Sequence, residues 1–186
     1  MTKKLIAPLF LLLFAFPAFS QVPNAAFKPS RDYSVGGGVD YWKGDWGHIA
    51  RFGPSLWATA ELWRGFGLNV EGHSMMAGGG DQAQEFKYYS AKGGVIYFRN
   101  FRKVKAYGKG ELGYGSLSWP HAQNSTYSHD TRNTWAFGGG VEAPVKGPVW
   151  LRADYTYEGF VDLIRHHTLN PTGVTVGFSY HFNKLK

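Results

Sequence analysis

Alternation of apolar and polar side chains is the clearest pattern in the chain, and it is strongest over residues 172–182. Successive side chains of a β-strand point to opposite faces of the sheet, so this segment has one apolar face and one small, polar face. The apolar face consists of Val174, Val176, Phe178, Tyr180 and Phe182. We predict a strand here. Its pattern alone fits both a water-soluble sandwich, with the apolar face in the core, and a membrane barrel, with that face toward lipid.

Further segments with the same two-residue period precede it. They are 33–42, 54–63, 66–75, 86–98, 103–115, 134–143 and 149–157. The connections alternate long and short, and the short ones are 64–65, 99–102 and 144–148. Outer-membrane barrels have an even number of bilayer-crossing strands, joined by short periplasmic turns and long extracellular loops. The sequence therefore predicts an all-β fold, an eight-stranded antiparallel up-and-down transmembrane β-barrel with both termini on the periplasmic side.

The charged residues of the predicted strands favour the barrel, because none of those considered falls on an apolar face. Eight strands close into a barrel whose interior is filled by its own side chains, and a buried charge without a partner is costly. We expect the acids to pair with Lys92, Lys109 and Arg152, with inner-face glycines making room, and no continuous water pore. The expected lumen charge network comprises Asp40, Glu61, Glu71, Lys92, Lys109, Glu111, Glu142, Arg152 and Asp154; Lys105 lies on the same polar face.

The N-terminus has the pattern of a cleavable signal peptide. Two lysines precede the apolar run 5–16, and Ala18-Phe19-Ser20 supplies the small residues that a signal peptidase reads. The run is shorter than the ~20 residues that span a bilayer. We predict a signal peptide over 1–20, an approach segment over 21–32 and the barrel over 33–186. The chain has no cysteine, which excludes disulfides and a lipid-anchored N-terminus.

The formal net charge of +7 at pH 7 is spread along the chain. No block of Lys and Arg suggests a nucleic-acid partner. The high aromatic content says more about the fold than the net charge does, because aromatic side chains form girdles at the membrane interfaces of outer-membrane barrels. Candidates near strand ends are Trp42, Trp57, Trp63, Tyr89, Tyr97, Tyr114, Trp135, Tyr155, Tyr157 and Tyr180. By register, Trp57 and Trp150 face inward.

The last predicted strand also carries a recognition motif. Thr175, Gly177, Tyr180 and Phe182 match the polar-x-Gly-x-x-aromatic-x-hydrophobic signal that the barrel assembly machinery reads. With the strand pattern, this motif makes the chain resemble the OmpA/OmpX-type small outer-membrane β-barrel family over essentially the whole mature chain. The resemblance implies a monomer in the bacterial outer membrane, with lipid, lipopolysaccharide and the assembly machinery as partners and no cofactor. Residues 183–186 follow the final aromatic residue, where many members end.

Three functions are open, and a structural, surface-interaction or adhesion role through four extracellular loops ranks first. A narrow channel for ions or small solutes is second, and a lipid A-modifying enzyme is third. Glu71 and His73, with Asp154 or His181, could form an acid/base pair, but such pairs are expected in any narrow barrel. The lipid A deacylase family is similar in size and topology, yet its His-x-Ser motif is missing from 149–157. We therefore expect no enzyme.

Polar residues of the expected long loops offer two further sites. Arg51, Arg132 and Arg165 are candidates for lipopolysaccharide phosphates, since a guanidinium binds phosphate through two parallel hydrogen bonds. The loop histidines could meet only if their loops touch, and their spacing does not fit a closed zinc site. They are His121, His129, His166 and His167. We expect no metal.

Overall fold

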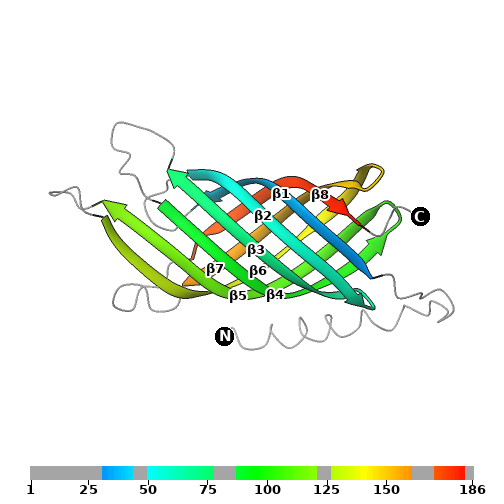
Figure 1. Cartoon of the computed structure of the whole chain (residues 1–186), viewed down its shortest axis with the longest axis horizontal. Coiled ribbons are helices and arrows are strands. Elements are labelled where there is room, and N and C mark those ends of the chain that lie inside the picture. Colours follow the sequence, from blue (N-terminus) through cyan, green and yellow to red (C-terminus); the bar gives the residue numbers. More distant parts are fainter. Residues whose placement is uncertain (1–30, 44–49, 78–86, 121–126, 161–169, 183–186) are drawn as a thin grey trace, which may run out of the picture.

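The computed structural model describes residues 31–43, 50–77, 87–120, 127–160 and 170–182. They form eight strands: β1 (Asp32–Lys43), β2 (Ala50–Trp63), β3 (Phe66–Ala77), β4 (Lys87–Phe101), β5 (Val104–Pro120), β6 (Tyr127–Lys146), β7 (Val149–Phe160) and β8 (Thr172–His181). Each strand pairs antiparallel with the next, and β1 pairs with β8, so the sheet closes into a barrel (Figure 1). The predicted eight-stranded antiparallel barrel is confirmed. The predicted signal peptide lies outside the described residues.

The seam between the first and last strands is a full antiparallel ladder. It runs from Ser34 opposite His181 to Lys43 opposite Thr172, and the Phe182 amide donates to the Tyr33 carbonyl at 2.9 Å. Closure gives every described strand two neighbours. A sheet without an edge can pair its backbone groups where lipid offers no hydrogen bonds.

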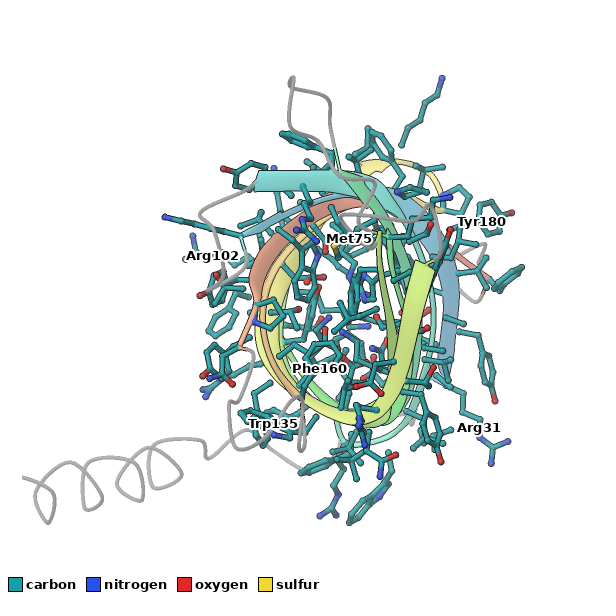
Figure 2. All side chains as sticks on the ribbon, turned by 90° about the vertical axis from the view of Figure 1, so that its left-hand side faces the viewer. Arg31, Met75, Arg102, Trp135, Phe160 and Tyr180 are labelled. Carbon is teal, nitrogen blue, oxygen red and sulfur yellow. The ribbon has the colours of Figure 1, made fainter. Side chains whose placement is uncertain are left out.

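Side-chain burial is inverted relative to a water-soluble protein. Leu56 and Leu112 are 70% and 72% exposed on the outside, whereas Asp40, Glu142 and Arg152 are fully buried inside. Figure 2 shows Met75 and Phe160 within the barrel outline and Trp135 and Tyr180 outside it. An apolar outer face and a charged interior are the arrangement of a barrel that sits in lipid. Among the described residues, no helix is long and apolar enough to cross a membrane.

The prediction that residues 116–133 form a connection between strands was wrong, because most of them belong to β5 and β6. Ser116–Pro120 pairs with Tyr127–Thr131 in one continuous ladder. The neighbouring strands stop earlier, at the pairs Lys87–Ser118 and Thr134–Phe160, so β5 and β6 project beyond the rim on the side of the long connections (Figure 1). At Ser116 and Leu117 the polar side chain lies on the outer face and the apolar one points inward, the reverse of the lipid-crossing strands, since a strand in water needs no apolar outer face.

Several other boundaries also differ. Asp32 is the first residue of β1 rather than part of an approach segment, β7 continues to Phe160, and the predicted turn 99–102 is mostly strand, since Arg99 pairs with Ala106. Two tight turns contain non-glycine residues with positive φ, Arg64 and Arg102, both at 48°. The turn 64–65 is as predicted, whereas the other two turns are shorter than predicted and comprise 102–103 and 147–148.

The predicted aromatic girdle is partly on the outside and partly in the lumen. The prediction that Trp42 belongs to the girdle was wrong. Its side chain is 2% exposed, because even-numbered positions of β1 point inward. Trp57 and Trp150 are buried, as the register predicted. The exposed candidates are Trp63, Tyr89, Tyr97, Tyr114, Tyr155, Tyr157 and Tyr180, and Trp135 is half-buried.

Candidate functional site: the charged lumen

The structure places all the residues of the predicted network inside the barrel. The side chain of Glu61 is 13% exposed, and the buried members are Asp40, Glu71, Lys92, Lys109, Glu111, Glu142, Arg152 and Asp154. Asp32, Glu158 and His181 lie there too, so each strand contributes a charged or titratable side chain. Alternation, continued into segments 21–32 and 158–171, was the signal that could have located Asp32 and Glu158.

Glu71 and Arg152 form the centre of the network. Arg152 donates from Nη2 to Glu71 and from Nε to Asp154 at 2.9 Å. Lys109 Nζ also donates to Glu71 and lies 3.4 Å from Asp154 Oδ1. Two carboxylates therefore face two cationic side chains. The Tyr107 hydroxyl also donates to Asp154 at 2.8 Å. Such pairing offsets the desolvation of buried charges.

The Arg152 guanidinium is also held between two rings. Its Cζ lies 4.6 Å from the Trp57 ring centroid and 4.8 Å from the Tyr107 ring centroid. The Trp57 ring in turn lies over Gly36 and Gly177, where a Cβ atom would approach it to 2.4 Å and 2.7 Å. These glycines make the room that the sequence predicted for large inner side chains.

Each buried histidine lies between two carboxylates. His73 Nδ1 is 2.7 Å from Asp40 and its Nε2 is 3.4 Å from Glu71. The hypothesised Glu71–His73 pair therefore exists, although Asp40, rather than Asp154 or His181, completes it. The Nδ1 contact has hydrogen-bond geometry, whereas the Nε2 contact with Glu71 is a longer ion-pair distance.

The second histidine site is at the turn end of the barrel. His181 Nδ1 lies 2.9 Å from Asp32, and its Nε2 lies 3.6 Å from Glu142. Lys105 lies 3.2 Å from Asp32 and 2.7 Å from Glu61. Seven acids but only four Lys and Arg side chains are buried in the described part of the chain. The two histidines therefore lie in a lumen where buried carboxylates outnumber buried lysine and arginine side chains.

An apolar layer lies above the charges at the loop end. It consists of Trp42, Met75, Tyr88, Leu117 and Phe160. The Tyr88 ring contacts Trp42 and Phe160, with centroids 6.2 Å and 5.8 Å apart, and its hydroxyl donates to Glu158 at 2.6 Å. Leu117 and Phe160 lie in segments that the sequence predicts to be loops, so the sequence does not predict this layer.

The residues of the assembly motif divide between the two faces. Thr175 points inward and donates to Asp40 at 2.7 Å, and Gly177 lies under the Trp57 ring. Tyr180 and Phe182 are exposed, with ring centroids 5.2 Å apart. The motif thus serves the lumen and the outer surface together.

Two of the arginines predicted to contact lipopolysaccharide phosphates lie within the described residues, on separate strands. Arg51 and Arg132 were wrongly assigned to loops, because they lie in β2 and β6. Arg132 Nε is 2.9 Å from Asp130, and Arg165 lies outside the described residues. His121, His166 and His167 also lie outside them, and His129 belongs to β6. In the described ranges, no group of three or more His, Cys, Asp and Glu side chains is placed to hold a metal.

Solved structures with the same fold are outer-membrane proteins. Neisserial surface protein A is 20% identical and matches 81% of this chain and 97% of its own, with a TM-score of 0.69. The attachment invasion locus protein Ail of Yersinia pestis is 18% identical over 82% and 99%, with a TM-score of 0.59. OprG from Pseudomonas aeruginosa is 12% identical over 82% and 96%, with a TM-score of 0.60. At these identities the likeness concerns the fold alone.

Comparison at the sequence level adds the family. No curated protein sequence matched the chain. The family model described as outer membrane protein beta-barrel domain matches residues 8–182, nearly the whole length. Together with the closed barrel, its apolar outside and its charged interior, this match shows that the chain belongs to the outer membrane protein beta-barrel domain family.

Proposed function

We propose that this outer-membrane barrel acts in surface interaction, and specifically in adhesion, through its loop end. The observation that carries the proposal is the β5–β6 hairpin, which projects beyond the neighbouring strands as a paired ladder. Two paired strands hold their shape better than a free loop of the same length, so they present a defined surface away from the membrane. The Thr131 hydroxyl donates to Ser116 across this ladder at 3.3 Å.

The name of one structural relative supports this proposal. Ail is named for attachment and invasion, and one of its structures contains the heparin analogue sucrose octasulfate. A sulfated polysaccharide is therefore a reasonable first ligand to test with the present chain. The experiment displays the barrel on a non-adherent bacterial host and counts cells bound to a heparin-coated surface and to cultured epithelial cells.

The informative variant shortens the hairpin symmetrically by deleting 118–120 and 127–129, which are paired with one another. Adhesion should fall to the level of the empty host, while a heat-modifiable band shows that the barrel has folded. Deletion of residues 183–186, at the end of the chain, serves as the control and should leave adhesion unchanged. Adhesion retained by the shortened barrel would contradict the proposal.

A channel or an enzyme is less well supported by the lumen. Lys109 and Arg152 are engaged with Glu71 and Asp154, and the apolar layer lies between these charges and the loop end. We expect the purified barrel to be silent in planar bilayers. Steady ion-selective steps that change on Lys109→Ala or Arg152→Ala would favour the channel instead, and altered lipid A in expressing cells would favour the enzyme.

Lipopolysaccharide is a further proposed partner of the outer rim. Arg132 has a 44% exposed side chain, but it shares its charge with Asp130. Replacement of Asp130 by Asn should therefore strengthen lipopolysaccharide binding, and Arg132→Gln should weaken it. Equal binding by both variants would exclude Arg132 from that contact.

A further inference from the structure

The turn end of the barrel carries an exposed basic patch. We define the turn-side patch as Arg64, Arg99, Arg102 and Lys103, all of which are exposed. Of the acids in the described residues, only Asp130 lies outside the lumen, and it belongs to the hairpin at the opposite end. No ion pair within the described part of the chain neutralises the turn-side patch. Its positive charge is therefore available to a partner.

The β2–β3 and β4–β5 turns bring this patch together. Strand β3 pairs with β4, with Phe66 opposite Tyr97, and the Phe98 amide donates to the Gly65 carbonyl at 2.7 Å. Arg64 and Arg99 each adjoin one member of that hydrogen-bonded pair. Arg102 and Lys103 follow at the end of β4. Four cations thus come from one side of the turn rim.

Exposed aromatic rings support two of the guanidinium groups. Arg64 Cζ lies 4.8 Å from the Trp63 ring centroid, and Arg99 Cζ lies 5.4 Å from the Phe101 ring centroid. Trp63 and Phe101 are 60% and 52% exposed on the outer surface. Aromatic side chains at strand ends lie at the level of the lipid headgroups. The guanidinium groups are therefore held at the depth where lipid phosphates lie.

The backbone of both turns points to a use for the arginine side chains. Arg64 and Arg102 have φ of 48°, the left-handed region in which Gly, Asn and Asp are the usual residues. Residues held in such conformations cluster at functional sites, which makes the two arginines candidates for a role of the side chain. An arginine occupies a position with positive φ in both adjacent turns, which points to a role that the two side chains share.

We propose that the turn-side patch binds the phosphate groups of anionic phospholipids in the periplasmic leaflet. Short turns of outer-membrane barrels face the periplasm, and arginine binds phosphate through paired hydrogen bonds. The ring-supported positions favour a lipid over a partner in solution, because they place the charges beside the acyl-chain boundary. The inference is independent of the adhesion proposal, which concerns the opposite end of the barrel.

Lipid selectivity measured by electron paramagnetic resonance tests this proposal. The full barrel is reconstituted in phosphatidylcholine vesicles with trace spin-labelled phosphatidylglycerol or phosphatidylcholine, and the motionally restricted fraction gives their relative association. We expect about fivefold selection of phosphatidylglycerol at the patch, appearing as roughly twofold over the whole lipid shell. Added salt should reduce the selection, since the charges are exposed.

The test variant carries Arg64→Gln, Arg99→Gln and Arg102→Gln. The matched control, Lys43→Gln, Lys87→Gln and Lys146→Gln, removes the same charge from positions outside the patch, and heat-modifiability shows that both variants fold. Loss of selectivity in the test variant alone supports the proposal. Unchanged selectivity, or an equal loss in the control, overturns it. The proposal is also overturned if the parent barrel shows no selectivity for phosphatidylglycerol but binds isolated peptidoglycan through these arginines. That result would favour a cell-wall partner.

Discussion

Lys92 Nζ lies 2.8 Å from Glu158 Oε2, and both side chains are completely buried in the lumen. The pair joins β4 to β7 across the barrel, and the Tyr88 hydroxyl donates to the other Glu158 oxygen at 2.6 Å. Removing one partner leaves an uncompensated buried charge. Replacing both partners by uncharged residues removes the desolvation cost together with the attraction.

The first prediction concerns this pair. Lys92→Met should lower the free energy of unfolding by about 3–5 kcal/mol, and the double variant Lys92→Met, Glu158→Gln, which keeps an acceptor for the Tyr88 hydroxyl, should recover most of that loss. Urea-dependent unfolding in lipid vesicles, followed by the heat-modifiable band, measures both. A double variant no more stable than Lys92→Met would mean that the pair does not act as a unit.

The second prediction concerns Arg152, whose planar guanidinium contacts two acids and lies between two rings. Lysine keeps the charge but cannot reproduce the forked contacts or the stacking. Arg152→Lys should therefore destabilise the barrel by about 2–3 kcal/mol. Arg132→Lys, at the exposed Asp130 pair, should change stability by less than about 0.5 kcal/mol. Urea unfolding of both variants compares a buried site with an exposed one.

Most of the barrel was predictable because lipid imposes a regular pattern. Each bilayer-crossing strand must be apolar outside, so Val39, Leu112 and Phe178 mark the register that turns Asp40 and Glu111 inward. The same pattern located all the residues of the predicted lumen network. Their partners were not predictable, because antiparallel pairing fixes neighbours in the sheet and not which side chains meet across the lumen, as Lys92 and Glu158 do.

The pattern failed at the loop end because polarity inverts there. Leu117 points into the apolar layer while its neighbour Ser116 lies on the other face, which is the distribution of a water-soluble sheet. At Phe160 the outward neighbour is Gly159, which is covered by Trp135: a Cβ at Gly159 would meet that ring at 2.3 Å. Without outward apolar residues, both segments read as loops. The left-handed conformation of Arg64 and Arg102 could not be predicted from the sequence either, because arginine is not a residue type that favours it.

The third prediction concerns Gly177, which adjoins β1 and the Trp57 ring. An alanine Cβ there would lie 2.2 Å from the Gly37 carbonyl oxygen and 2.7 Å from Trp57. The backbone cannot yield this space without moving the seam, so Gly177→Ala should destabilise the barrel by about 1–3 kcal/mol and slow its folding into vesicles. Gly72→Ala is the control, since its nearest atom is 3.9 Å away. Comparable losses in both variants would contradict the steric explanation.

The fourth prediction separates backbone from side chain at the first tight turn. Arg64, with φ of 48°, precedes Gly65, with φ of 87°, and Asn-Gly is the pair preferred when both residues have positive φ. Arg64→Asn should therefore stabilise the barrel by about 0.5–1 kcal/mol in phosphatidylcholine vesicles, because asparagine tolerates this conformation better. In vesicles containing phosphatidylglycerol the gain should shrink or reverse, since the variant also loses a phosphate contact. Urea unfolding in the two lipid mixtures measures the difference, and an equal gain in both would show that the arginine contributes nothing through its charge.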